Sequence, residues 1–289
     1  MKSVFPIPAL VLLALTGLPL AAHAACPTDL EAAAVAAAIV ARQPVPVPAG
    51  EMSVADGLCG RDKVVRYLAQ ISGPVVGYKA GLTNLAVQQR FKHDAPLRGT
   101  LFQGMLLRDG AELAVDYGIR PVFEADLVVE VADPAALAKA DTPLAALKAL
   151  KSYAPFIELP DLMVADPSKL GGAMLAMVNV GARAGVLGKA TPIQPSPGLA
   201  DTFATMTVTL TDATGAVLDT GKGSAILGNP LTAASWLARD LASAGIPLKR
   251  GDLLSLGSFT RLFPPKPGMA VTAKYEGLPG NPTVGVMFR

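Results

Sequence analysis

Histidine is scarce in this chain of 289 residues, which contains only His23 and His93. A zinc site built from several imidazole side chains is therefore excluded. A Ser-His-Asp triad would have to depend on His93 alone, because His23 lies in a segment expected to be removed. His93 stands in the polar segment Lys92-His93-Asp94, so we expect it to be a solvated loop residue.

Phosphate-binding motifs are also missing. No GxxxxGK[ST] segment occurs, which excludes the common nucleotide-binding loop. The stretch Gly221-Lys222-Gly223-Ser224 fails as a dinucleotide fingerprint, because Ile226 stands where the third glycine belongs. The net charge is only +2 and no basic run is interleaved with aromatic residues, so nucleic acid is not an expected partner.

The first 24 residues are typical of a secretory signal peptide. Lys2 is followed by the uncharged apolar run 9–20 and by the small-x-small pattern Ala22-His23-Ala24. This run is shorter than the roughly 20 residues that span a bilayer as a helix, and no later stretch is long and apolar enough. A buried N-terminal helix and a lipid anchor on Cys26 are the alternatives. We therefore expect a periplasmic or secreted protein without a stable membrane anchor.

Cysteine is as rare as histidine, with only Cys26 and Cys59 present. Neither belongs to a CxxC motif or lies near a histidine, so metal-binding and redox-catalytic roles are not expected. In an oxidising compartment the two would most simply form a disulfide that ties the mature N-terminus to the rest of the protein. Two unpaired thiols are the alternative.

The hydrophobic and turn patterns predict an α+β or mainly β fold rather than a doubly wound parallel sheet, because helices and strands do not alternate regularly. Residues 25–74 form a helical segment with an extended proline-rich connector at 44–48, and residues 75–289 form the main domain. The predicted helices are 29–42, capped by Thr28 or Asp29, then 62–71, 142–153 and one that is capped by Asn229, begins at Pro230 and ends before Gly245. The predicted strands are 75–79, 119–131, one beginning at 155–158, then 205–211, 253–256, 270–275 and 283–288.

Two acids on one predicted strand are candidate metal ligands. Glu124 and Asp126 are two residues apart, so their side chains project from the same face of a strand. Their apolar neighbours would leave both carboxylates on a partly dry surface, where like charges repel unless a cation lies between them. Hard oxygen ligands of this kind suit Mg²⁺, Mn²⁺ or Ca²⁺. The alternative is a solvent-facing strand edge on which both acids are hydrated.

Two further charged residues stand in suggestive surroundings. Glu158 follows the apolar run 154–157 and is either a ligand or catalytic group or simply the end of a strand. Lys79 stands between Gly77 and Gly81 and could hold an anionic substrate, or it could be an ordinary surface lysine.

Taken together, these segments resemble the 2-oxopent-4-enoate hydratase / 4-oxalocrotonate decarboxylase family of the fumarylacetoacetate hydrolase superfamily. The resemblance runs in one order from about Val75 to the C-terminus. It is carried by Gly77-Tyr78-Lys79-Ala80-Gly81-Leu82-Thr83, Gly99-Thr100-Leu101-Phe102, Phe123-Glu124-Ala125-Asp126, Ile157-Glu158, Gly223-Ser224, Asn229-Pro230-Leu231, Trp236-Leu237-Ala238, Gly251-Asp252 and Leu256-Gly257-Ser258.

The resemblance implies a mixed β-sheet roll with flanking helices, in a protein that is usually a homo-oligomer. It implies a divalent ion, Mg²⁺ or Mn²⁺, held by Glu124, Asp126 and Glu158. It also implies a small 2-oxo acid as substrate, with the ion stabilising the enolate while water adds across a double bond. Lys79 and Glu158 are the implied catalytic residues, and the implied substrate-binding residues are Lys79, Leu82, Asn179 and Ser224.

Several positions depart from the family pattern. Gly104 replaces an acid in Phe102-Gln103-Gly104-Met105, and Asp126 replaces a glutamate in the metal motif. Gly181 stands in a block that usually carries a serine, and Asn229 replaces a histidine. The leading hypothesis is a metal-dependent hydratase-like lyase. The rival is an exported binding protein that kept the pocket and lost the reaction. Hydrolysis of a carbon–carbon bond is disfavoured, because it typically needs a His–Glu arrangement and only His93 is available.

Overall fold

The computed structural model describes residue 1, residues 26–48 and residues 50–289. The predicted signal peptide, residues 2–24 in particular, lies outside the described residues. No helix in the described part of the chain is long and apolar enough to cross a membrane. The helices are α1 Asp29–Ala41, α2 Val54–Ser72, α3 Leu85–Arg90, α4 Pro134–Lys139, α5 Pro143–Lys148, α6 Gly172–Met177, α7 Pro197–Thr205 and α8 Pro230–Ser243.

The larger of two sheets has eight strands and mixed directions. Its strands run in the order β2-β1-β11-β5-β6-β7-β3, with the short β8 paired to β6. β1 is parallel to β11, and β3 is parallel to β7, whereas the other pairs are antiparallel. Its strands are β1 Val75–Gly81, β2 Leu97–Phe102, β3 Leu106–Arg108, β5 Glu124–Val131, β6 Leu150–Leu159, β7 Ala184–Leu187, β8 Thr191–Pro192 and β11 Leu253–Ser255.

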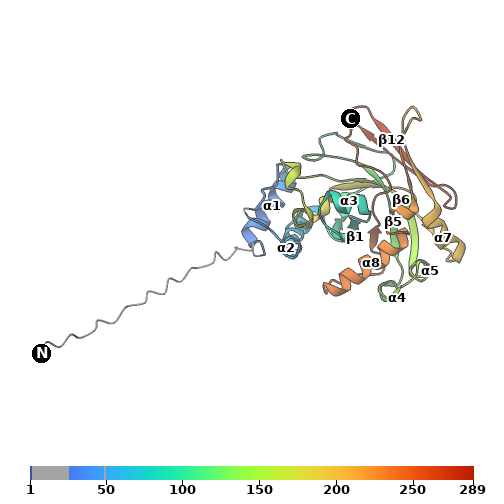
Figure 1. Ribbon diagram of the computed structural model, residues 1–289. Helices are drawn as coiled ribbons and strands as arrows, with labels where there is room; N and C mark the ends of the chain where they lie inside the picture. Colours follow the sequence, from blue (N-terminus) through green and yellow to red (C-terminus); the bar gives the residue numbers. More distant parts are fainter. Residues whose placement is uncertain (2–25, 49) are drawn as a thin grey trace.

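A second sheet of five strands packs against the first, and Figure 1 labels its strand β12. Its order is β10-β9-β12-β13-β4. Apolar side chains from both sheets and from α8 share one buried core, so the α+β sheet roll predicted from the sequence is confirmed. The strands are β4 Ala111–Leu113, β9 Thr207–Asp212, β10 Val217–Lys222, β12 Ala270–Glu276 and β13 Thr283–Phe288.

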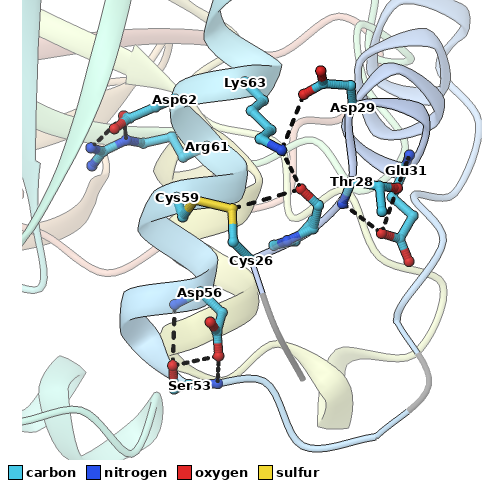
Figure 2. The surroundings of a disulfide bond; sticks show 11 residues. Cys26, Thr28, Asp29, Glu31, Ser53, Asp56, Cys59, Arg61, Asp62 and Lys63 are labelled. Atoms are coloured by element: carbon cyan, nitrogen blue, oxygen red, sulfur yellow. Dashed lines mark hydrogen bonds and ion pairs between the residues drawn. A yellow bond between two sulfur atoms is a disulfide. The ribbon is translucent and has the colours of Figure 1, made fainter. Parts of the chain in front are cut away.

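The N-terminal helices α1 and α2, which lie side by side in Figure 1, form a second, smaller hydrophobic cluster with α6 and with the chain near β2. The disulfide between Cys26 and Cys59 joins the start of α1 to α2, with 5.6 Å between the Cα atoms. Figure 2 shows that Lys63 reinforces this join, because its Nζ donates to Pro27 O at 2.8 Å and lies 3.1 Å from Asp29 Oδ1. The structure therefore contains the disulfide expected from the sequence.

Most of the predicted elements are present, and the exceptions have physical causes. The helix predicted at 142–153 ends at Lys148, because Leu150–Leu159 pairs as β6 along the whole of β5. The strand predicted at 119–131 begins only at Glu124, because the amides of Ile119 and Arg120 donate to the Asp161 carboxylate instead of to a strand. The second helix begins at Val54 rather than at residue 62, since Ser53 and Asp56 form a capping box.

Candidate active site

Lys79 is buried on the larger sheet, one strand in from the edge strand β2. It lies on β1, between β2 and β11, and its side chain is 4% exposed. Its Nζ lies 2.5 Å from Glu158 Oε1 and donates to Val180 O at 3.0 Å. Gly99 on β2 leaves room for the lysine, because a Cβ there would come within 2.9 Å of Lys79 Cγ. Lys79 is therefore an enclosed cation and not a surface lysine.

The carbonyl that receives Lys79 sits in a strained turn. Asn179, Val180 and Gly181 have φ values of 56°, 55° and 67°, a left-handed conformation that is unfavourable for a β-branched valine. The Asn179 side chain holds this turn, because its Oδ1 accepts from Thr100 N at 2.7 Å and its Nδ2 donates to Thr100 O at 2.9 Å. Asn179 thus fixes the Val180 carbonyl that the Lys79 ammonium contacts.

Glu124 and Glu158 face each other across β5 and β6, where they are register partners. Burial and then the negative charge of Glu158 raise the pKa of Glu124 well above its usual range, although Lys79 opposes this. Burial by itself would lower the pKa of Lys79, but Glu158, Glu124 and Asp126 outweigh it and the pKa is raised. A nearby positive charge therefore stabilises the ionised form of these acids, and the Lys79 ammonium supplies one such charge.

Asp126 is fully buried, but its carboxylate is directed to a neighbouring loop. Its Oδ1 accepts from the amides of Leu127, Leu256 and Gly257, and its Oδ2 accepts from Ser255 Oγ at 2.6 Å. Burial and Glu158 raise the pKa of Asp126 to about 7, against these donors. In this arrangement Asp126 anchors the loop after β11 beside Glu124.

The donor set fits a divalent cation through two of the three predicted ligands. Glu124 and Glu158 supply hard carboxylate oxygens on one sheet face, and Mg²⁺ is commonly bound by one or two carboxylates plus water and substrate oxygens. Across the described residues, no group of three or more His, Cys, Asp or Glu side chains is arranged to hold an ion. The three-acid ligand set stays a prediction, since Asp126 would have to release Ser255 to join it.

A cavity of about 510 Å³ opens above these groups and is lined by Lys79, Glu124 and Glu158 at its charged end. Much of the remaining wall is apolar and comes from Leu82, Phe91, Leu162, Leu175, Phe259 and Leu262. Gly257 lets the loop after β11 approach this wall, because its φ is 112° and a Cβ would lie 2.1 Å from Thr83 Oγ1. The volume and the few convergent polar groups are typical of a small-molecule site.

The structure brings most of the predicted site residues together. Lys79, Leu82, Glu124 and Glu158 line the cavity, and Asp126 lies directly behind it. Asn179 and Ser224 do not line it. Asn179 is committed to the backbone of β2, and Ser224 is an exposed residue of the turn Gly223–Ala225, so their predicted contacts with substrate have no support in this geometry.

Sequence reasoning missed the outer wall of the cavity, formed by α3 and by the loop after β11. Asn84 caps α3, with its Oδ1 accepting from Ala86 N at 2.9 Å, and this cap was a readable signal. Arg90, Thr260 and Arg261 also line the cavity, but no local pattern marks them.

Comparison with known proteins agrees with this arrangement. No family model matches the chain. It is 30% identical over 210 residues to a 2-keto-4-pentenoate hydratase of Burkholderia vietnamiensis, covering 71% of this chain and 75% of that protein. It is 32% identical over 211 residues to a 2-keto-4-pentenoate hydratase of Paraburkholderia phymatum, with the same coverage.

A solved structure shares the fold over nearly the whole chain. This is the 4-oxalocrotonate decarboxylase of Pseudomonas putida, complexed with magnesium and adipate, with a TM-score of 0.76 at 23% identity over 92% of this chain and 100% of that one. The likeness shows a common sheet roll. The sequence similarity to the hydratases goes further, and the chain belongs to the 2-keto-4-pentenoate hydratase family.

Proposed function

We propose that this protein is a divalent-metal-dependent hydro-lyase that adds water to a small 2-hydroxy dienoic or 2-oxo acid. The observation that carries the proposal is the buried pair Lys79 and Glu158, with the part-buried Glu124 opposite Glu158, in the wall of the cavity. A chain of the hydratase family that keeps two facing carboxylates and a buried ammonium keeps the central parts of a site for an anionic oxo acid. The magnesium in the related decarboxylase supports a divalent ion, and either Mg²⁺ or Mn²⁺ suits these ligands.

Each residue has a distinct role in the proposed reaction. Glu124 and Glu158 would hold the ion, which when bound supplies Lewis-acid stabilisation for negative charge on the substrate's 2-oxygen. Lys79 places a fixed positive charge beside the same end of the cavity and attracts the substrate carboxylate. Because Lys79 Nζ and Glu158 Oε1 are 2.5 Å apart, Glu158 can take the proton of the 2-hydroxyl while the Lys79 ammonium gives one to carbon, and the proton on Glu158 then restores the ammonium. The apolar wall limits bulk water around the chain of the substrate.

The test is hydration of 2-hydroxypenta-2,4-dienoate, followed as loss of its ultraviolet absorbance with Mg²⁺ or Mn²⁺ present. We expect turnover by the wild type and at least a hundredfold loss of kcat/KM in Glu124→Gln, as is usual when a transition-state charge loses its stabilising group. Glu130→Gln is the matched control, since Glu130 lies on the same strand but pairs with Lys151 and Ser152 away from the cavity. An unchanged rate in Glu124→Gln would contradict the proposal.

A binding protein for small 2-oxo acids is the second candidate, and one observation favours it. Asp126, one of the three predicted ligands, is committed to four donors. Gly104, the other departure in this part of the sequence, lies against Ser72 and does not line the cavity. Absence of turnover, together with metal-dependent thermal stabilisation by 2-oxo acids, would select this candidate.

We also propose that the protein acts outside the cytoplasm. The signal-peptide pattern in residues 1–24 supports this, and a disulfide between Cys26 and Cys59 is compatible with an oxidising compartment. Expression of the full chain should yield a periplasmic or secreted product whose N-terminus is Ala25, as read by intact mass. A product that keeps residues 1–24 and stays in the cytoplasm would contradict export.

A further inference from the structure

The outer part of the cavity carries a positive charge that the proposed reaction does not use. Six charged side chains line the cavity: Lys79, Arg90, Glu124, Glu158, Asp219 and Arg261. Lys79 pairs with Glu158, and Arg261 pairs with Asp219, whose Oδ2 lies 3.2 Å from the arginine Nε. Arg90 makes no ion pair within the described chain, so its charge is available to a ligand.

Arg90 is an exposed residue of α3 whose guanidinium lies against the wall of the cavity. It lies in the last turn of α3, and Gln88 of the same helix is buried and donates from Nε2 to Leu82 O at 2.8 Å. The Arg90 guanidinium also lies 5.7 Å from the centre of the Phe91 ring, which itself lines the cavity. The Gln88 hydrogen bond fixes α3 on the cavity wall, and the ring of Phe91 orients the exposed Arg90 guanidinium beside that wall.

The cavity is much larger than a five-carbon acid requires. Such a molecule would fill roughly a quarter to a third of about 510 Å³ at the packing density of protein interiors. With its 2-oxo acid end beside Lys79 and the two glutamates, a longer chain would pass the apolar wall toward the rim. A negative group at its far end would meet Arg90.

We propose that Arg90 is a specificity-determining residue that recognises a distal carboxylate, so that the cavity prefers 2-oxo or 2-hydroxy dioic acids to the corresponding monoacids. This inference deepens the proposed function and rests on it. The ligand then has an anion at each end, one at the buried charged group and one at the exposed arginine. Guanidinium groups suit this task, since they form paired hydrogen bonds with carboxylates.

The test compares two ligands that differ only at the far end, 2-oxoadipate and 2-oxohexanoate, by calorimetric titration of the mature protein with Mg²⁺. The wild type should bind the diacid more tightly, by about 2- to 5-fold, as expected for one exposed ion pair. Arg90→Gln should remove this preference and leave the affinity for 2-oxohexanoate unchanged, whereas Arg90→Lys should retain part of it. Arg66→Gln is the matched control, since Arg66 is an exposed arginine of α2 that does not line the cavity.

The outcomes separate this inference from the proposed function. Equal affinity for both ligands, lost for both in Glu124→Gln, would overturn the role of Arg90 and leave the 2-oxo acid site intact. A diacid preference that survives in Arg90→Gln would also overturn it. No binding of either ligand would overturn both the inference and the proposed function.

Discussion

Removal of the Lys79 ammonium should destabilise the metal-free protein severely. The ammonium and the Glu158 carboxylate are at most 4% exposed and 2.5 Å apart. At an effective dielectric constant of about 20, their gross attraction is roughly 7 kcal/mol, and the cost of desolvating both charges offsets part of it. Lys79→Met would leave the buried Glu158 beside the part-buried Glu124 without a cation, so we expect a loss of about 3–5 kcal/mol in the free energy of unfolding.

The measurement is urea denaturation at pH 7 with a chelator, for Lys79→Met and for the control Lys151→Met. Lys151 Nζ lies 2.7 Å from Glu130 Oε1, but the lysine is 60% exposed, so its replacement should cost about 0–1 kcal/mol. The double variant Lys79→Met/Glu158→Gln should recover much of the loss, because it removes the unpaired charge. If Lys79→Met is no more destabilised than Lys151→Met, the argument from burial is refuted.

Three further predictions follow from the same structure. Burial raises the pKa of Glu124 and raises that of Asp126 to about 7. The stability that these carboxyls contribute is therefore present below their unfolded pKa values and lost as pH rises through the folded ones. Mg²⁺ should raise Tm more at pH 8 than at pH 5, and an equal rise at both would contradict this. Cys59→Ser opens a link between residues 33 apart and should cost about 3–4 kcal/mol in denaturant unfolding, against no loss if the bond does not form in solution. Tyr275→Phe removes the hydroxyl that donates to Asp126 O and accepts from Phe156 N, and should cost about 1–3 kcal/mol; a Tm equal to that of the wild type would show that these backbone groups find other partners.

Local chemistry was sufficient to predict many of the elements. Asn229 and Pro230 begin α8 as their cap and first-turn preferences require, and Thr28 caps α1. Strand β13 was predicted with its observed bounds, because its apolar residues alternate along residues 283–288. Such signals depend on a few neighbouring residues, so they survive into the fold.

The misplaced elements depend on contacts between distant residues. Residues 149–153 look helical in isolation, but pairing with β5 is worth more than that local preference. The amides of Ile119 and Arg120 leave the predicted strand because Asp161, about 40 positions away, accepts them. No pattern in a short window of sequence contains that information.

The candidate site divides in the same way. The sequence determined which side chains could do the chemistry, since Lys79, Glu124 and Glu158 stand in motifs with a recognisable order and spacing. Only the tertiary structure decided that Lys79 is buried against Glu158 and that the Asp126 carboxylate bonds to the loop after β11. It also decided that Arg90 lines the same cavity. The physical reason is that burial and pairing of charges are set by which strands and loops become neighbours, and those neighbours are up to about 180 residues apart in the chain.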